Sequence, residues 1–581
     1  MITDSEIPPP LSVSPACPQH THTRYELTPQ DPLRAGELGR SLAISPLIAQ
    51  VLLNRGIALP EPAKTFLAPK LAHLTRPDGM ADRTIAAERL AEAVRKRERI
   101  VVFGDYDVDG TTSAAILSGI LEQLGGDVRT LLANRFDGGY GLSDPALDRC
   151  LREQPRVLVT CDCGSSDHAR VQRAHDAGVD VIVIDHHLVP AKPLAAVAFL
   201  NPHRPVCGFP YKGLCSAGLA LSMGAALRQV MKADLDIRPW LDLVALGTIA
   251  DVAPLDGDNR ALVRTGLQML SADDARPGIV ALRELAKIRP GTALGAIDVA
   301  FRMTPRLNAA GRLGDPAITL SLLRAQSLTE ARLIALEIER LNNERKLLER
   351  HATEAAIAQL GSTSRERAGI VAAGEGWHRG VVGISAARLV DRYQRPALAI
   401  ALHGELGHGS GRAPDGFPLH AALSRAAHLL EGFGGHDAAV GLTVRADRID
   451  ALREAFEQAC AELTTQREDP PVHVDAKLAG DHGYTLPRAS ELGLLEPLGE
   501  GNPEPVFEIE AELVRAEIVG SDHLKLSLRA GGGELSAFGF EMGAHRANLL
   551  TPRVRAWGSL RADTYRGNER VELRLLQVEA V

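Results

Sequence analysis

Cysteine, aromatic residues and long apolar runs are all scarce in this sequence of 581 residues. Seven cysteines, an odd number, argue against a disulfide framework and favour a reducing, cytoplasmic setting. No apolar stretch approaches the roughly 18 residues of a membrane-spanning helix, and the acidic, proline-rich beginning does not fit a signal peptide. Positive charge is not in excess either, because 65 Lys and Arg face 73 Asp and Glu, a net charge of −8. This excludes a histone-like binder but not a nucleic-acid enzyme with a local basic groove.

The chain length predicts three or four domains, and the patterning changes along the sequence accordingly. Residues 1–75 begin with a leader rich in Pro, Ser and Thr, over about 1–35, and continue with short helical patterns that predict a small helical lobe. In residues 76–270, short apolar runs alternate with segments of helical spacing. Strands separated by such helices predict right-handed βαβ units and a parallel sheet.

The remaining sequence predicts a helical connector, a second α/β domain and a small β-barrel. Within residues 271–362, the run 317–360 contains neither Gly nor Pro and repeats Leu and Ile every three or four residues, as one long helix does. Such a helix either joins two lobes or packs on one of them. Residues 363–468 return to α/β patterning, and residues 469–581 show the short alternating segments typical of a barrel.

Acidic and imidazole side chains directly follow three of the predicted strands. The strands that end at Phe103, Thr160 and Ile184 are followed by segments containing GDYDVDG, DCG and DHH. Together with one Asp at the end of an apolar helical segment, the residues concerned are Asp105, Asp107, Asp109, Asp162, Asp185, His186, His187 and Asp251. Because ligands bind at the carboxyl ends of parallel strands, we expect these side chains to converge.

Such a convergence predicts a metal site. Carboxylates brought close together repel one another unless cations neutralise them. Carboxylates combined with imidazoles suit Mn²⁺ or Mg²⁺, and two such ions about 3.5–4 Å apart can hold a phosphoryl group for hydrolysis. A single Asp after a strand is more often a loop cap or a solvated charge, whereas four such places in one domain favour metal binding.

Taken in order, these and later motifs resemble the DHH phosphoesterase superfamily, and within it the RecJ branch of bacterial single-stranded-DNA exonucleases. The resemblance covers most of the chain after about residue 75. In the first α/β domain it depends on GDYDVDG, NRFDGGYGLS, DCG, DHH and GTIAD, and further on it depends on PRLNAAGRLG, GWHRGVVGI, GSGRAP and GGHDAAVG. The DHH motif alone is a weak signal, but the ordered set is specific.

The resemblance implies a parallel-sheet DHH domain, a long connecting helix, an α/β DHH-associated domain and a C-terminal β-barrel of the OB-fold type. It also implies 5′→3′ removal of nucleotides from single-stranded DNA with two Mn²⁺ or Mg²⁺ ions, in recombination and repair. Asp105 is then a metal ligand or supports one, and His187 faces the scissile phosphate. By motif position, the implied metal ligands are Asp107, Asp109, Asp162, His186 and Asp251.

Donor side chains elsewhere are expected to hold the DNA, and the Gly-rich segments suit a close approach of the backbone to phosphates. Ser410 and Arg412 are the candidates for reading a 5′-phosphate, because the planar fork of Arg grips two oxygens; alternatively, Arg412 pairs with Asp415. In the barrel, Trp557 either lies in the core or stacks on a base. The candidate substrate-binding residues are Arg135, Tyr140, Arg306, Asn308, Arg312, Ser410, Arg412 and His436.

Two alternative functions are considered besides the exonuclease. A DHH hydrolase of short oligonucleotides or cyclic dinucleotides would lack the connecting helix and the barrel, and a catalytically dead DNA-binding scaffold would have lost metal ligands. The expected partners are single-stranded DNA and, from the resemblance, a single-strand-binding protein and a recombination helicase. The chain is expected to be a monomer without membrane contact.

Overall fold

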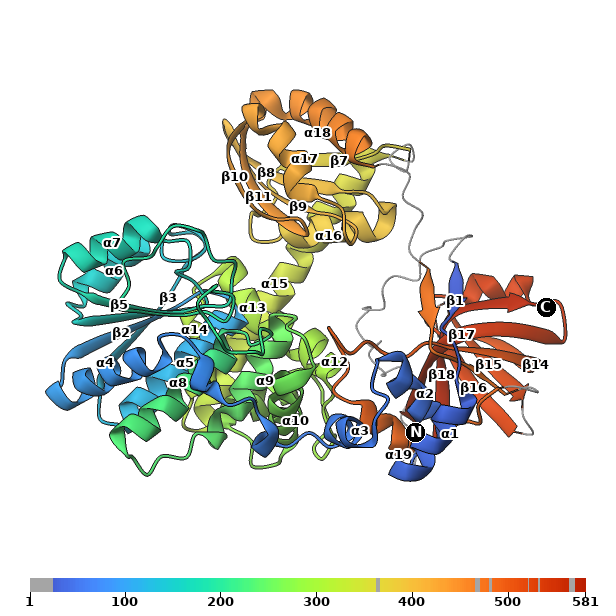
Figure 1. Cartoon of the computed structure of the whole chain (residues 1–581). Helices are drawn as coiled ribbons and strands as arrows, with labels where there is room; N and C mark the ends of the chain where they lie inside the picture. The colour runs from blue at the N-terminus through green and yellow to red at the C-terminus, as the bar shows by residue number, and fades with distance from the viewer. Residues whose placement is uncertain are drawn as a thin grey trace.

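Three lobes make up the computed structural model (Figure 1). The first α/β domain and the barrel lie on either side of a group of helices, and the second α/β domain lies at the far end of the long helix α15 (Leu328–Leu360). Among the helices described, none combines the length and the apolar character that crossing a bilayer requires. The structure describes residues 24–361, 366–464, 471–479, 483–520, 522–530, 533–563 and 570–581.

The first α/β domain is built on a five-stranded sheet in the order β3-β2-β4-β5-β6, with all neighbours parallel. Val and Ile dominate the central strands because both faces of the sheet are covered. The parallel sheet expected from the sequence is therefore present. Its strands are β2 (Arg99–Gly104), β3 (Asp127–Leu132), β4 (Val157–Cys161), β5 (Asp180–Ile184) and β6 (Ala198–Leu200).

Helices cover this sheet on both sides. One face packs on α4 (Arg83–Lys96), α5 (Val108–Gln123), α8 (Ser216–Met231) and α9 (Leu241–Ala250). The other face packs on α6 (Asp144–Arg152) and α7 (His168–Asp176). In Figure 1 these two layers lie below and above the sheet. The loops that carry the acidic motifs lie at the edge of the sheet formed by the C-terminal ends of β2, β4 and β5.

The connector contains a break that the sequence pattern does not predict. The run 317–360 forms two helices, because the chain leaves the helical path at residues 325–327 and Ser327 then caps α15, accepting from the Glu330 amide at 3.2 Å. At about 1.5 Å per residue, the 33 residues of α15 span roughly 50 Å. Helix α15 contacts α11 and α13 near its start and α16 and β7 near its end, so it joins two lobes. Helix α10 (Gly257–Ser271) ends the first α/β domain. The connector helices are α11 (Pro277–Leu285), α12 (Ala296–Asp298), α13 (Thr304–Leu313), α14 (Ala317–Arg324) and α15.

The second α/β domain has a mixed sheet in the order β10-β11-β9-β8-β7, in which only β7 and β8 are parallel. Its strands are β7 (Ile370–Glu375), β8 (Ala397–His403), β9 (Leu406–Arg412), β10 (Leu430–His436) and β11 (Ala439–Arg445). Helix α16 (Val382–Tyr393) packs on one face, and α17 (Leu419–Arg425) and α18 (Ile449–Leu463) pack on the other.

The C-terminal domain is the expected barrel. Strand β14 pairs with β15 on one side and with β17 on the other, which closes the sheet. Full closure removes the exposed edges that an open sheet would leave for aggregation. The strands are β13 (Ala476–Leu478), β14 (Phe507–Val519), β15 (His523–Ala530), β16 (Gly533–Gly539), β17 (Arg553–Asp563) and β18 (Arg570–Ala580), with the short helix α19 (Ala489–Leu492).

The N-terminal helices do not form a lobe with a core of their own. Leu47, Ile48 and Leu52 share one hydrophobic core with Phe507 and Leu524 of the barrel, because so short a segment cannot bury its apolar side chains alone. Part of the expected unstructured leader is also ordered, while its residues 1–23 lie outside the described part. The elements are β1 (Tyr25–Leu27), which pairs with β12 (Val472–Val474), and α1 (Pro32–Leu42), α2 (Pro46–Asn54) and α3 (Pro60–Leu67).

Arg260 of α10 ties the barrel to the first α/β domain. Its side chain is buried, and its guanidinium group stacks over the ring of Phe66 at 3.7 Å. It donates to backbone carbonyls of the segment 494–497 and to that of Phe66, at 2.8–3.2 Å. A buried guanidinium group is costly unless it is hydrogen-bonded. The hydrogen bonds of Arg260 therefore hold the segment 494–497 and Phe66 against α10.

Candidate metal centre

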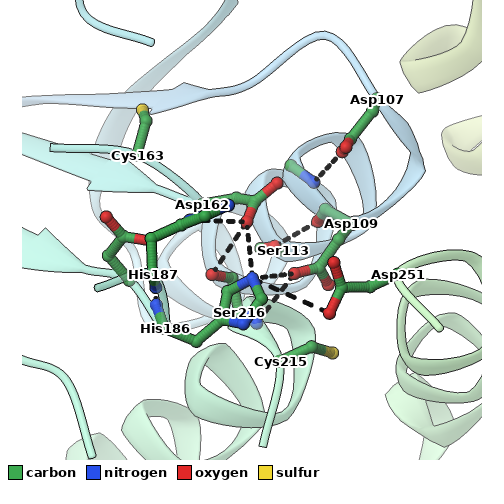
Figure 2. A network of polar contacts seen from close by, with 12 residues as sticks. Asp107, Asp109, Ser113, Asp162, Cys163, His186, His187, Cys215, Ser216 and Asp251 are labelled. Carbon is green, nitrogen blue, oxygen red and sulfur yellow. Dashed lines mark hydrogen bonds and ion pairs between the residues drawn. The ribbon is translucent and has the colours of Figure 1, made fainter. Parts of the chain in front are cut away.

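Three strand ends bring the acidic and imidazole side chains to one edge of the sheet (Figure 2). Asp162 follows β4, the strand that pairs with both β2 and β5, and therefore lies in the middle. Its φ of 64° is in the left-handed region, which costs a residue other than Gly about 1–2 kcal/mol. Asp251 reaches the same place from the C-terminal end of α9. Strain of this kind is typical of functional sites.

The side chains form three overlapping groups, in each of which the ligand atoms lie within 4.8 Å of one another. Asp162 and His186 each belong to two groups, which fits two neighbouring ions that share ligands. All five residues expected as ligands from their motifs are members, and Asp105 and His187 are members too. The groups are Asp162–His186–His187, Asp109–His186–Asp251 and Asp105–Asp107–Asp162.

Two helix N-termini hold the carboxylates of the first motif. Asp109 accepts from the backbone amides of Ser216 and Ala217, at 2.8 and 2.9 Å, in the first turn of α8. Asp107 is the N-cap of α5 and accepts from the Gly110 amide at 3.0 Å. Free amides at a helix start stabilise a negative charge, so both carboxylates are fixed before any cation arrives.

The cluster is electrostatically crowded without cations. Burial raises the pKa of Asp105 and of Asp162 well above the ordinary value, and the nearby Asp107 carboxylate raises both further. Burial and the Asp109 charge raise the pKa of Asp251 to about 8. Burial lowers the pKa of His186, which favours the neutral imidazole that a metal ligand must be. Bound cations would remove the repulsion.

Asp105 provides a direct test of whether a cation fits. The residue is fully buried, and its Oδ1 accepts from the Gly141 amide at 3.1 Å. Its Oδ2 is buried and has no hydrogen-bond partner among the described residues. A buried carboxylate oxygen without a partner is costly, and a metal ion next to Asp107 and Asp162 would satisfy it. The donor set of carboxylates with imidazole suits Mn²⁺ or Mg²⁺.

The sequence places Asp185 among the converging side chains but indicates no role of its own for it. It accepts from Nδ1 of His187 at 2.7 Å and from the Ser165 amide at 3.0 Å. Burial alone would raise the pKa of Asp185, but the hydrogen bond from His187 brings it below the usual value. The same bond outweighs burial at His187 and raises its pKa to about 9. Asp185 therefore orients His187, and its place at the head of the DHH motif was the available signal.

Three arginines converge next to the centre. Arg135 lies over the ring of Tyr106 at 4.3 Å, between the motif carboxylates and α13. Burial and the charge of Arg135 lower the pKa of Arg312 to about 10, and the same two causes lower the pKa of Arg412. In the part of the chain that is described, none of the three forms an ion pair with a carboxylate, including Asp415. The pairing of Arg412 with Asp415 is therefore not found.

Ser410 and Arg412 lie on β9 and face the first turn of α16. A Cβ placed on Gly383 would lie 3.3 Å from both the Ser410 hydroxyl and an Arg412 nitrogen. His436 is aligned with Arg412 across β11, because Ala439 pairs with both. The two therefore share one face of the sheet, and His436 is exposed. Hydroxyl, guanidinium and helix amides together form a place suited to an anion.

Some predicted DNA contacts have other roles in the structure. Arg306 is buried and paired with Glu339 at 2.7 Å, so it holds α13 against α15 instead of facing a substrate. Asn308 is half-buried on the same helix. Tyr140 donates to the backbone carbonyl of Asp162 at 3.0 Å, and its ring meets the ring of His187 edge to face, which places it at the centre. Trp557, for which the sequence left core packing and base stacking open, is buried and donates to Glu508, so it belongs to the barrel's packing.

Fold and site together define a phosphoesterase of the DHH class, and family models agree. The DHH family N-terminal domain matches residues 99–248, the DHHA1 domain matches 366–462 and the RecJ OB domain matches 474–577. The chain is 38% identical over 474 residues to the single-stranded-DNA-specific exonuclease RecJ of Dickeya dadantii, covering 78% of this chain and 82% of that protein.

Two further relatives identify the branch of the DHH phosphoesterases to which the chain belongs. The RecJ protein of Bacillus subtilis is 33% identical, with coverage of 95% of this chain and 70% of the relative. A crystal structure of RecJ from Thermus thermophilus in complex with Mn²⁺ superimposes with a TM-score of 0.80 at 31% identity, covering 96% of this chain and 80% of that one. The chain belongs to the RecJ family.

Proposed function

We propose that this protein is a metal-dependent exonuclease that removes nucleotides from the 5′ end of single-stranded DNA. The observation that carries the proposal is the pair of ligand groups sharing Asp162, beside arginines that have no acidic partner among the described residues. Relatives named single-stranded-DNA-specific exonucleases, and RecJ structures with Mn²⁺ and with Mg²⁺, support it. The proposed ligands are Asp105, Asp107, Asp109, Asp162, His186 and Asp251.

The residues of this chain have distinct tasks in the hydrolysis. Two bound ions would neutralise the phosphate oxygens and activate a water molecule. Asp185 holds Nδ1 of His187, and the Tyr140 hydroxyl lies 3.2 Å from the other ring nitrogen. These two groups fix the imidazole beside the metal ligands, where it would interact with a phosphate oxygen. The oxygen of water joins the phosphorus, the bond from phosphorus to O3′ of the terminal nucleotide breaks, and a proton ends on that O3′. The shortened strand keeps a new 5′-phosphate.

The anion-binding face of the second α/β domain would select the end of the strand. A terminal phosphate carries more negative charge than an internal phosphodiester. Ser410 and Arg412 on β9, with Arg135 from the first domain, provide donors near the metal centre. Holding the terminal phosphate there would place the next phosphodiester at the metals and release one nucleotide each time.

The two rival functions are less well supported. A compact DHH hydrolase of short oligonucleotides has no need of the closed barrel or of the helix α15. A dead scaffold would have lost ligands, yet all five motif ligands converge here. We therefore retain the exonuclease as the single conclusion.

The deciding experiment compares DNA ends in the presence and absence of Mn²⁺. We expect a 5′-phosphorylated single strand to be degraded to mononucleotides, a 5′ overhang to be trimmed to its junction, and a blunt duplex and a dinucleotide to react slowly. A chelator should stop all reactions. Equal rates on the blunt duplex and the single strand, or a preference for the dinucleotide, would contradict the proposal.

The cellular location and the partner proteins are further parts of the proposal. The six cysteines that the structure describes are free and buried, which supports a reducing cytoplasm. A single-strand-binding protein and a recombination helicase are proposed partners because both handle the same substrate. We propose that the enzyme acts as a monomer, since one chain provides every ligand.

A further inference from the structure

One contact between the two α/β domains has no part in the chemistry described above. The ring of Phe136, in the loop after β3, lies 5.6 Å from the ring of His378, edge to face. Arg379 covers the same phenyl ring at 4.6 Å. His378 and Arg379 belong to the loop between β7 and α16, so these three residues, called the Phe136 contact below, join one domain directly to the other.

A close approach of two backbones lies beside the Phe136 contact. Arg312 donates to the Gly380 carbonyl at 3.3 Å, and a Cβ on Gly380 would lie 2.0 Å from the Arg312 carbonyl oxygen. Gly311 also lies close to Tyr106, because a Cβ on it would lie 2.6 Å from the Tyr106 carbonyl oxygen. Tyr106 belongs to the loop that carries the motif carboxylates. The junction between the domains therefore reaches the metal centre without a gap in its backbone contacts.

The cations proposed to hold the terminal phosphate are neighbours of this junction. Arg135 precedes Phe136 in the chain and donates to the Gly311 carbonyl at 3.4 Å. The positive charge of Arg135 lowers the pKa of both Arg412 and Arg312, so the three side chains are close to one another. An endonuclease must let the strand run past the metals on both sides, whereas an enzyme that needs an end has one side closed. Because Phe136 directly follows Arg135, a strand that continued past a phosphate held by Arg135 would meet the Phe136 contact.

We infer that the Phe136 contact is the stop that makes this nuclease dependent on a free end. It denies passage to a continuous strand and limits each cut to one nucleotide. The inference rests on the proposed function, because it places the stop behind the proposed site for the 5′-phosphate. Phe136, His378 and Arg379 are on this view specificity residues, and they take no part in breaking the bond.

The test uses a circular single strand and a linear 5′-phosphorylated strand of the same sequence, both with Mn²⁺. The wild-type protein should leave the circle intact. Phe136→Ala should raise the ratio of circle loss to linear degradation at least about tenfold and should add dinucleotides to the first products. Arg379→Ala should act in the same direction. The matched control is Arg392→Ala, which removes an exposed Arg over Tyr393 in the same domain and should change nothing.

Each outcome has a defined meaning. An unchanged ratio in both Phe136→Ala and Arg379→Ala overturns the inference, and if the first variant does not fold, the second decides. Circle loss that persists when Phe136→Ala is combined with Asp162→Asn comes from another nuclease and also overturns it. A wild-type protein that fails to degrade the linear strand would instead disprove the proposed function, and this is seen before any variant is compared.

Discussion

Asp162 is the residue on which the two-ion arrangement depends, because among the described residues it alone belongs to the groups on both the Asp105 side and the His187 side. Asp162→Asn should lower turnover about 1,000-fold or more, since several kcal/mol of transition-state stabilisation depend on the ions. The metal-free variant should melt no lower than wild type, because one crowding charge is gone, and the rise in Tm on adding Mn²⁺ should shrink. A nuclease assay measures the turnover, and calorimetry measures Tm with and without Mn²⁺.

A control for this variant is Asp176→Asn, which changes an exposed carboxylate at the end of α7 in the same domain. It should keep the turnover and the Mn²⁺-induced shift of the wild-type protein. Near-normal turnover by Asp162→Asn with saturating Mn²⁺ would refute its role as the shared ligand.

Arg412 offers a second prediction at this scale. Arg412→Ala should reduce the preference for a 5′-phosphate over a 5′-hydroxyl by about 10–100-fold, because a charge-assisted hydrogen bond contributes roughly 1.5–3 kcal/mol. Mn²⁺ affinity should not change, since no ligand is removed. The comparison is Arg425→Ala, whose side chain pairs with Glu462 on the same domain. An equal loss on both substrates would show that Arg412 does not read the end.

Individual residues also show how far the sequence could lead. The convergence of the acidic and imidazole side chains was predictable because each follows a strand or helix end, and such ends meet in a parallel sheet. The contacts of Arg306 and Trp557 were not predictable from the sequence. The same Arg could pair with Glu339 or with DNA, and the same Trp could donate to Glu508 or stack on a base. The orienting role of Asp185 needed the distance to His187.

Among the elements, the apolar strands were predicted well and the helix break was not. Strands such as β5 are continuous apolar runs bounded by turn residues, a pattern that is local. The break before α15 is held by the Ser327 cap and by the Gln326 amide, which donates to Glu330 at 3.1 Å. The run has no Gly or Pro, and the spacing of Ser327 and Glu330 is its sequence signal for a helix start. The packing of α1 to α3 on the barrel depends on residues far away in the chain, and no local pattern contains that information.

The Ser327 cap can be tested by hydrogen exchange. Ser327→Ala should destabilise the first turn of α15 by about 1 kcal/mol, the usual contribution of an N-cap. The Glu330 amide should then exchange about fivefold faster, while the last turns of α15 keep their protection. Ser321→Ala, which removes a hydroxyl within α14, should have little effect. Uniformly faster exchange along α15 would argue against a local cap.

At the scale of the whole molecule, the barrel cannot be removed alone. Deleting residues 470–581 should expose Leu47, Ile48 and Leu52 and cause aggregation, because the barrel provides the rest of their core. A chain of residues 76–464 should instead stay soluble and hydrolyse DNA slowly. Its binding to long single strands should be weaker and less salt-dependent, because phosphate contacts are lost with the barrel. Light scattering tests the expected aggregation, and salt titrations test the expected loss of DNA binding. An unchanged affinity of residues 76–464 for long single strands would contradict a role of the barrel in binding.

The shared core of the first and last segments has a consequence for synthesis. Gln50 accepts a hydrogen bond from Tyr484, a residue 434 positions later. At the usual 5–20 residues per second, the ribosome needs roughly 20–90 s to reach that partner. During this interval α2 and α3 lack the barrel side chains that complete their core, while the two α/β domains can already fold. Apolar side chains of α2 are therefore exposed on the nascent chain until the barrel has been made, the condition under which chaperones bind, and the N-terminal helices and the barrel are expected to complete their common core together.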